Sequence, residues 1–270
     1  MTDKLNAKVM ATTLMLAFSS FSMHASAETK VVTANEVNWG YLNPARGDKS
    51  PGAADLWGDR TKDTATGMLV RFNKGFESPP HIHNITYRGI VIEGEMHNDD
   101  PQAAKMWMPT GSFWTQPAGE DHTTAANDKT NLIYLEIDEG PYLVKPSKEQ
   151  FDNGEKPINV HVDNMVWLSD SDLATINAAG VSATYLWGDT SAVFGSMVKI
   201  PKNFKGSIDS NADEFKAVII RGSLEYSDNT TLKPGSFVRS TGKSQLMIEN
   251  NTNEDAIVYI RTSSPYQVSN

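Results

Sequence analysis

Three histidines offer the clearest chemistry in this sequence. His81 and His83 are separated by one residue, and His122 follows the turn-forming run Pro117-Ala118-Gly119. If residues 81–83 form a strand, alternation places both imidazoles on the same face. An imidazole from His122 would then complete a set of three nitrogen ligands, which is a common donor set for a catalytic metal ion.

The rest of the composition restricts what else could bind a metal. The chain of 270 residues contains six His and no Cys. Thiolate zinc sites, cysteine nucleophiles and disulfides are therefore excluded, and any metal must rest on imidazole and oxygen ligands. Because no disulfide can stabilise the fold, the chain has to bury an adequate hydrophobic core.

Two segments around these histidines resemble the two sequence motifs of the cupin family. GFESPPHIHNITYRGIVIEG (residues 75–94) resembles the first motif, which reads Gly, five residues, His-x-His, three or four residues, Glu, six residues and Gly. GSFWTQPAGEDH (residues 111–122) resembles the second, which reads Gly, five residues, Pro-x-Gly, two residues and His. Both occur in the right order, separated by residues 95–110, so the resemblance is specific.

This resemblance implies a small jelly-roll β-barrel in which His81, His83 and His122 point into the cavity and bind one divalent transition metal. The glutamate that usually supplies a fourth ligand is replaced by Tyr87. A phenol, with an ordinary pKa of about 10, is a poor ligand at neutral pH, so positions on the metal would stay open to water or substrate. Tyr87 is then an acid/base or hydrogen-bond donor beside the metal, or an aromatic side chain that fills space.

Three-histidine iron sites occur among cupins, including dioxygenases, so the resemblance implies metal-dependent chemistry on a small organic substrate. Dioxygenation, isomerisation and hydrolysis all remain open, and imidazole ligands alone do not choose among iron, zinc, nickel and manganese. The alternative is a noncatalytic periplasmic module that binds or senses a metal or a small ligand. The resemblance does not name the substrate, because cupin-like barrels host unrelated reactions.

Four further polar side chains lie within, between or after the two motifs. Glu93 and Glu95 have the same strand parity as His81, which makes them secondary candidates as ligands. His97 and His161 lie in polar surroundings and are expected to be solvated.

An internal repeat organises the rest of the chain. The tetrapeptide Leu-Trp-Gly-Asp occurs at residues 56–59 and again at 186–189. YRGIVIEG (residues 87–94) then matches FKAVIIRG (residues 215–222) without gaps, and Pro-Tyr pairs close the copies at residues 141–142 and 265–266. The repeat predicts an N-terminal metal-binding cupin domain at residues 28–148 and a degenerate C-terminal cupin domain at residues 149–270.

The second copy lacks the metal ligands. Asp209, Asn211 and Leu246 stand at the positions that face the three histidines, and Phe215 faces Tyr87. This set cannot rebuild the site, so the second domain is expected to pack on the first or to bind something without metal.

Large aromatic side chains serve the core, a pocket or both. Trp57 and Trp187 recur in both copies, which favours an architectural role. Trp107 and Trp114 flank the second motif and either line a pocket for an apolar or sugar-like ligand or pack in the core.

The elements that must position these residues are β-strands. Short runs rich in Val, Ile, Tyr and Phe alternate with Gly, Pro, Asn and Asp, as in antiparallel sheets, and only residues 169–179 suggest a turn or two of helix. The predicted fold class is all-β, with two tandem jelly-roll barrels from an internal duplication that pack face to face. A monomer is then sufficient, and a homodimer is the alternative.

The N-terminus and the charge bear on location and partners. Lys4 and Lys8 precede an apolar run and the sequence Ala25-Ser26-Ala27, which predicts a signal peptide at residues 1–27 and a periplasmic or secreted protein. The apolar run is too short to span a bilayer, so no membrane insertion is expected. The formal net charge of -9, without a cluster of Lys and Arg, argues against nucleic-acid binding.

Overall fold

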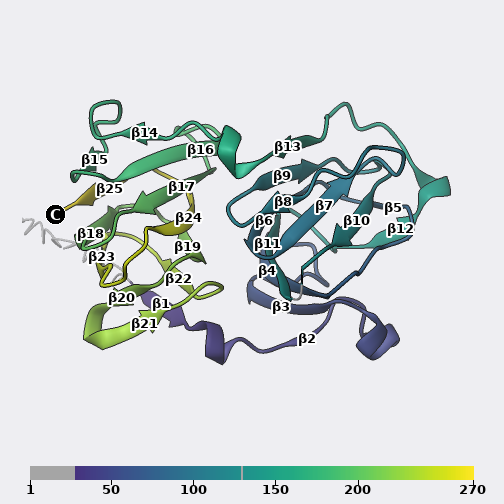
Figure 1. Ribbon diagram of the computed structural model, residues 1–270, viewed down its shortest axis with the longest axis horizontal. Coiled ribbons are helices and arrows are strands. Elements are labelled where there is room, and N and C mark those ends of the chain that lie inside the picture. Colours follow the sequence, from purple (N-terminus) through teal and green to yellow (C-terminus); the bar gives the residue numbers. More distant parts are fainter. Residues whose placement is uncertain (1–27, 129) are drawn as a thin grey trace, which may run out of the picture.

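Strands dominate the structure. The computed structural model describes residues 28–128 and 130–270, which form two β lobes that lie side by side (Figure 1). The signal peptide predicted for residues 1–27 lies outside the described residues.

The first lobe contains the strands of both histidine motifs. Its strands are β2 (Gly40–Tyr41), β3 (Gly52–Trp57), β4 (Thr66–Asn73), β5 (His81–His83), β6 (Tyr87–Glu93), β7 (Glu95–Asp99), β8 (Met108–Pro109), β9 (Phe113–Gln116), β10 (Thr123–Ala126), β11 (Thr130–Ile137), β12 (Val144–Pro146) and β13 (Ile158–Val160). A seven-stranded sheet has the order β13-β9-β6-β11-β4-β3-β2. The sheet β10-β7-β8 and the pair β12-β5 complete the lobe.

The second lobe repeats this arrangement. Its strands are β1 (Thr29–Val32), β14 (Leu168–Ser169), β15 (Ile176–Asn177), β16 (Ser182–Gly188), β17 (Phe194–Ile200), β18 (Lys205–Ser210), β19 (Phe215–Arg221), β20 (Leu224–Tyr226), β21 (Thr230–Leu232), β22 (Phe237–Ser240), β23 (Ser244–Glu249), β24 (Ala256–Thr262) and β25 (Tyr266–Ser269). Its sheets have the orders β1-β22-β19-β24-β17-β16-β14 and β15-β25-β18-β23-β20-β21. The all-β jelly-roll prediction is confirmed.

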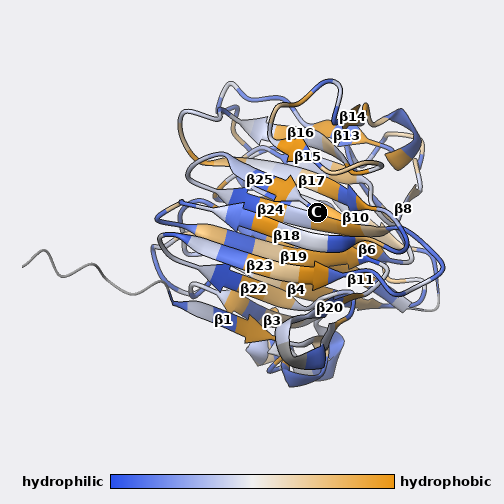
Figure 2. Ribbon diagram, turned by 90° about the vertical axis from the view of Figure 1, so that its left-hand side faces the viewer, coloured by the Kyte–Doolittle hydropathy of each residue, from blue (hydrophilic) through white to orange (hydrophobic). Residues whose placement is uncertain are grey.

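The central strands are hydrophobic on both faces because both faces are buried. In β4 and β11, Val70 and Leu135 point into the core of the first lobe, whereas Leu69 lies on the opposite face. Leu69 belongs to a cluster that also contains Val218 and Tyr259 of the second lobe. The two seven-stranded sheets therefore pack face to face, and Figure 2 shows hydrophobic residues concentrated on the stacked strands.

A buried carboxylate joins the two lobes. Glu136 of β11 is 1% exposed and accepts hydrogen bonds from the hydroxyls of Tyr134 (3.0 Å) and Tyr259 (2.8 Å). It also forms ion pairs with Arg88 and Arg261, each at 3.4 Å. Because Tyr259 and Arg261 come from the second lobe, one negative charge is shared by side chains of both lobes.

Two strands cross between the lobes. β1 pairs with β22, so Val31 lies opposite Val238 in the second lobe. β13 pairs with β9, so Asn159 lies opposite Trp114 in the first lobe. Each seven-stranded sheet therefore receives one edge strand from the part of the sequence that builds the other lobe.

Helical structure in the described residues is limited to five 3₁₀ segments, η1 (Ala34–Glu36), η2 (Pro44–Lys49), η3 (Ser147–Glu149), η4 (Val162–Asn164) and η5 (Ser227–Asn229). Of the turn or two of helix expected over residues 169–179, a single turn forms, in which the backbone N–H of Leu173 donates to Ser169 O (3.0 Å) and the backbone N–H of Ser169 donates to the Asp172 carboxylate (2.8 Å). Ile176 then pairs with Val268 in a sheet. Pairing with β25 ends the turn before a helix can extend.

The part of the chain that the structure describes has no helix with the length and apolar character needed to cross a bilayer.

Candidate metal centre

The backbone brings the three histidines together. His81 and His83 project from the same side of β5, while Ile82 between them is fully buried. His122 lies just before β10, and its backbone forms a reciprocal pair of hydrogen bonds with His81, both at 3.0 Å. One nitrogen from each imidazole lies within 4.8 Å of the others, which is close enough to share a metal ion.

Backbone carbonyls fix the orientation of all three rings. Nδ1 lies 2.9 Å from Pro79 O in His81, 3.2 Å from Leu143 O in His83 and 3.1 Å from Glu120 O in His122. A carbonyl only accepts, so Nδ1 must carry the proton and the lone pair of each ring lies on Nε2. This is the usual outer-shell arrangement of histidines that bind metals, and the donor set therefore fits a divalent transition ion.

The surroundings keep these imidazoles neutral. Burial lowers the pKa of His81, and burial together with the two neighbouring imidazoles lowers the pKa of His83 well below its usual value. Burial is also the main reason that the pKa of His122 falls to about 3. Neutral imidazole is the form that binds metal, so protons compete weakly for the site at neutral pH.

Two tyrosine hydroxyls lie against the candidate ligands. The Tyr87 hydroxyl lies 3.3 Å from His122 Nε2 and donates to Asn98 Oδ1 at 2.9 Å. The Tyr142 hydroxyl lies 3.2 Å from His83 Nε2, and its ring stacks on that imidazole with 4.4 Å between centroids. Burial raises the pKa of both hydroxyls, which therefore act as hydrogen-bond donors.

Sequence reasoning missed Tyr142 as a site residue. The Pro-Tyr pair was visible as part of the repeat, and its counterpart Tyr266 bonds to Ser196 (2.9 Å) rather than to a histidine. The repeat therefore identified the position, but the chemistry depends on the neighbouring His83, which only the folded chain brings there.

A polar network behind Tyr87 was also missed. Asn98 accepts from Tyr87 and Thr124 (2.7 Å) and donates to Gln116 (2.8 Å), all in the buried interior. Trp114 is 1% exposed, and its indole N–H has no hydrogen-bond partner of normal geometry among the described residues. This N–H lies close to the Tyr87 hydroxyl and partly offsets the rise in the Tyr87 pKa that burial causes. The network fixes the Tyr87 ring beside His122.

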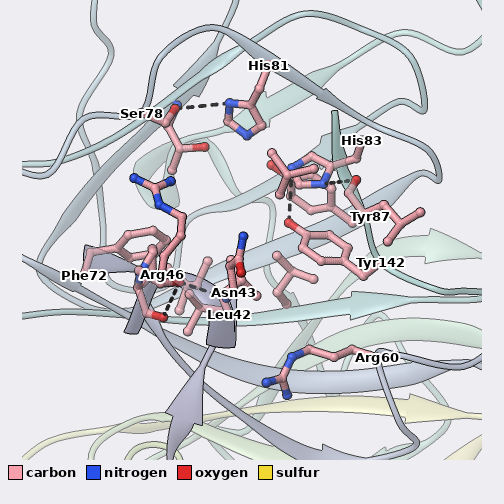
Figure 3. Close-up of a pocket in the computed structure, with 18 of the residues that line it drawn as sticks. Leu42, Asn43, Arg46, Arg60, Phe72, Ser78, His81, His83, Tyr87 and Tyr142 are labelled. Carbon is pink, nitrogen blue, oxygen red and sulfur yellow. Dashed lines mark hydrogen bonds between the residues drawn. The ribbon is translucent and has the colours of Figure 1, made fainter. Parts of the chain in front are cut away.

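A cavity of about 600 Å³ opens beside the histidines. Figure 3 shows His81, His83, Tyr87 and Tyr142 gathered on one side of it. Its walls are mostly apolar and include Leu42, Val70, Phe72, Phe76, Trp114, Ile133 and Leu135. Trp114 belongs both to this wall and to the hydrophobic core, so the two roles considered for it coincide.

The remaining polar candidates lie elsewhere. Neither Glu93 nor Glu95 joins the metal-ligand group, and the Glu95 carboxylate instead accepts from Asn127 (2.9 Å). The expectation that His97 is solvated was wrong, because pairing of β7 with β10 turns it inward, where it is 2% exposed and lies near the Trp107 ring. His161 is partly exposed and accepts from the backbone N–H of Asp163.

The second lobe holds no equivalent site among its described residues. Leu246, which faces His122 in the repeat, is 3% exposed in a hydrophobic core, and Phe215 is fully buried where Tyr87 stands in the first lobe. Trp187 donates to Tyr259 (3.0 Å) just as Trp57 donates to Tyr134 (3.1 Å), which supports the architectural role of both tryptophans. In the second lobe, hydrophobic side chains therefore occupy the positions that the metal-ligating histidines and Tyr87 hold in the first.

The first lobe combines a jelly-roll β fold of the cupin class with three clustered histidines, of which His81 and His83 line the cavity. Within that class, the chain belongs to the family DUF4437, described as a domain of unknown function, whose model matches residues 30–269. No curated protein sequence matches the chain at a significant level.

Solved structures share the fold at low sequence identity. A protein of Nostoc punctiforme, provisionally described as a dioxygenase, is 15% identical with a TM-score of 0.67 over 88% of this chain and 83% of its own. An oxalate decarboxylase of Lactobacillus farciminis is 12% identical (TM-score 0.57, 88% and 87% covered). Quercetin 2,3-dioxygenase of Acinetobacter baumannii is 16% identical (TM-score 0.54, 88% and 79% covered).

Proposed function

We propose that this chain is an exported bicupin whose first lobe binds one divalent transition metal through His81, His83 and His122 and acts on a small organic substrate. The main support is that a backbone carbonyl holds each of the three Nδ1 atoms, which leaves Nε2 to bind metal, and that one nitrogen from each imidazole lies within 4.8 Å of the others. A bound metal would supply Lewis-acid or redox chemistry, and its identity as iron, zinc, nickel or manganese is part of what must be measured.

The lining of the cavity favours dioxygenase-like chemistry over hydrolysis or isomerisation. Among the described residues that line it, none is Asp or Glu, and both tyrosine hydroxyls beside the histidines have raised pKa values. A general base works best when its pKa lies near the operating pH, and apart from the histidines assigned to the metal the described lining offers no Asp, Glu or His for that role. The Tyr87 hydroxyl donates its single proton to Asn98 (2.9 Å), so it donates to a group bound beside His122 only by giving up that bond.

The lack of a general base in the cavity lining is also compatible with a second candidate function. A module that binds a metal or small ligand without turnover needs no general base. It predicts saturable binding with no product, whereas the catalytic proposal predicts turnover that is lost in His122→Ala.

The similar order of the two seven-stranded sheets supports the bicupin part of the proposal. We propose that the lobes arose by internal duplication and that the division near residues 145–157 separates them in sequence. Export rests on the signal peptide proposed for residues 1–27, and N-terminal sequencing of protein from the periplasm tests it by the residue at which the mature chain begins.

Elemental analysis is the test of the metal site. Protein purified through its own export route is measured beside His81→Ala and His122→Ala. One equivalent of iron that is lost in both variants supports the dioxygenase-like proposal and leads to oxygen-uptake measurements on candidate substrates. Zinc, nickel or manganese would redirect the search, and absence of metal even after reconstitution would reject the site.

A further inference from the structure

Arg46 projects a positive charge into the cavity without an ionic partner. It lies on η2, between β2 and β3, and lines the same cavity as His81. Figure 3 shows its side chain extending past Phe72 toward Ser78 and His81. Among the described residues, no carboxylate forms an ion pair with its guanidinium.

The segment that carries Arg46 is held in place by its own hydrogen bonds. Asn43 accepts from the backbone N–H of Ala45 (3.1 Å) and donates from its own N–H to Ser50 Oγ (2.9 Å). Ser50 is buried, and its backbone N–H donates to Gly47 O (2.9 Å). These bonds fix both ends of η2, so Arg46 is presented to the cavity by an ordered segment.

The charge of the cavity is opposite to that of the protein. The chain has a formal net charge of -9, yet the charged side chains that line the cavity are Arg46 and Arg60, with no Asp or Glu among them. Arg60 is already neutralised by Asp55 at 2.7 Å and also donates to Tyr41 O at 3.0 Å. Arg46 is thus the uncompensated charge, and a divalent ion on three neutral histidines would add to it.

We propose that the ligand of this cavity is an organic carboxylate with an apolar or aromatic body, and that Arg46 determines this specificity by pairing with the carboxylate. The inference rests on the proposed function, in that it names the substrate class of the same site. Phe72, Phe76 and Leu135 supply apolar contacts for the body, while a guanidinium pairs with a carboxylate through two parallel hydrogen bonds. A neutral ligand of the same shape leaves the guanidinium without this partner.

The test compares two ligands that differ only in charge. Titration calorimetry measures 3-phenylpropionate and 3-phenylpropionamide against the protein as purified and again after chelation of metal. We expect the carboxylate to bind at least about tenfold more tightly, the size of one charged hydrogen-bonded contact. Arg46→Gln should remove the preference in both samples, and Arg46→Lys should keep part of it.

Lys49→Gln is the matched control. It removes one positive charge from the same η2 segment at a side chain that does not line this cavity, so the preference should persist. Equal affinity for the two probes, a preference that survives Arg46→Gln, or no saturable binding of the carboxylate would each overturn the proposal.

Metal content measured on the same samples separates the two proposals. An Arg46-dependent preference in protein that never binds metal would sustain the anion site and reject the metal-dependent function. One equivalent of metal without a preference for the carboxylate would do the reverse.

Discussion

At the scale of single residues, the site depends on the backbone for its protonation state. Each of the three Nδ1 atoms contacts a backbone carbonyl oxygen, from Pro79, Leu143 and Glu120. A side-chain substitution cannot remove these acceptors, so the Nε2 atoms should stay available in most variants. Loss of metal should therefore be confined to substitutions of the histidines or of the segments that carry the carbonyls.

His122→Leu should abolish metal binding without unfolding the chain. The second lobe already carries Leu246 at the facing position, 3% exposed in a hydrophobic core. Metal analysis and circular dichroism check this prediction, with Leu246→Ala as a control that weakens a core but retains metal. Loss of the folded spectrum in His122→Leu would contradict it.

Stability of the metal-free protein should fall as the pH falls. The pKa of His122 is about 3 in the folded protein, against about 6.5 in an unfolded chain, so below pH 6.5 only the unfolded chain takes up this proton. The effect begins near pH 6.5, grows until the pH approaches the folded pKa, and amounts to about 2 kcal/mol at pH 5.

Urea unfolding of chelated protein at pH 7.5 and pH 5 measures this loss. His122→Leu lacks the titrating group, so its loss between these two values should be smaller by about 2 kcal/mol. Equal losses in the two proteins would show that His122 does not govern the acid response.

Tyr142→Phe should bind metal more tightly than the natural protein. The Tyr142 hydroxyl lies 3.2 Å from His83 Nε2 and occupies the lone pair that a metal needs, while the stacked ring is kept by phenylalanine. Removing one hydrogen bond of about 0.5 to 1.5 kcal/mol predicts a gain of about two- to tenfold. Competition with a metal chelator measures it, and Tyr266→Phe in the second lobe should have no effect.

At the scale of elements, strand pattern and motif spacing predicted most of what the structure contains. The His-x-His pair lies on a strand, and the Pro-x-Gly turn brings His122 to it, because both depend on local backbone geometry. His97 was misjudged because burial depends on which sheet covers β7, and polar neighbours in sequence do not show this. Arg46 was not recognised, since nothing in its own segment indicates that it lines the same cavity as His81 and His83.

A charge placed on the crossing strand β1 should destabilise the second lobe and spare the metal site of the first. Val31 packs against the core of the second lobe, so Val31→Asp should cost about 1 to 3 kcal/mol. Urea unfolding and metal analysis are to be made on the same protein, with Thr29→Asp at an exposed position of β1 as the control. The prediction would be contradicted if Val31→Asp lost its metal while its free energy of unfolding stayed unchanged.

At the scale of the whole molecule, the lobes share a charged group that is costly to leave unpaired. Glu136 receives two tyrosine hydroxyls and two arginines, and Arg261 reaches it from the second lobe with 6% of its side chain exposed. The sequence predicted packing of the two sheets through the repeat. It could not predict this carboxylate, because Glu136 has no acidic counterpart in the second copy, where Arg261 stands on the matching strand.

Glu136→Gln should therefore destabilise the protein as a unit by about 3 kcal/mol or more, because it leaves buried guanidinium groups with less compensating charge. Both lobes should unfold in one transition at lower denaturant, measured by tryptophan fluorescence. Glu93→Gln, an exposed change of the same kind on β6, should leave the midpoint unchanged.

The crossing strands also set an order of events during synthesis. β13 must be made before the sheet of the first lobe is complete, and β1 has no partner until β22 at Phe237–Ser240 has left the ribosome. The first strand of the described residues is thus among the last to be paired. A chain interrupted before residue 237 would leave that strand's edge open to pairing with other chains, so completion of synthesis is itself a condition for the native fold.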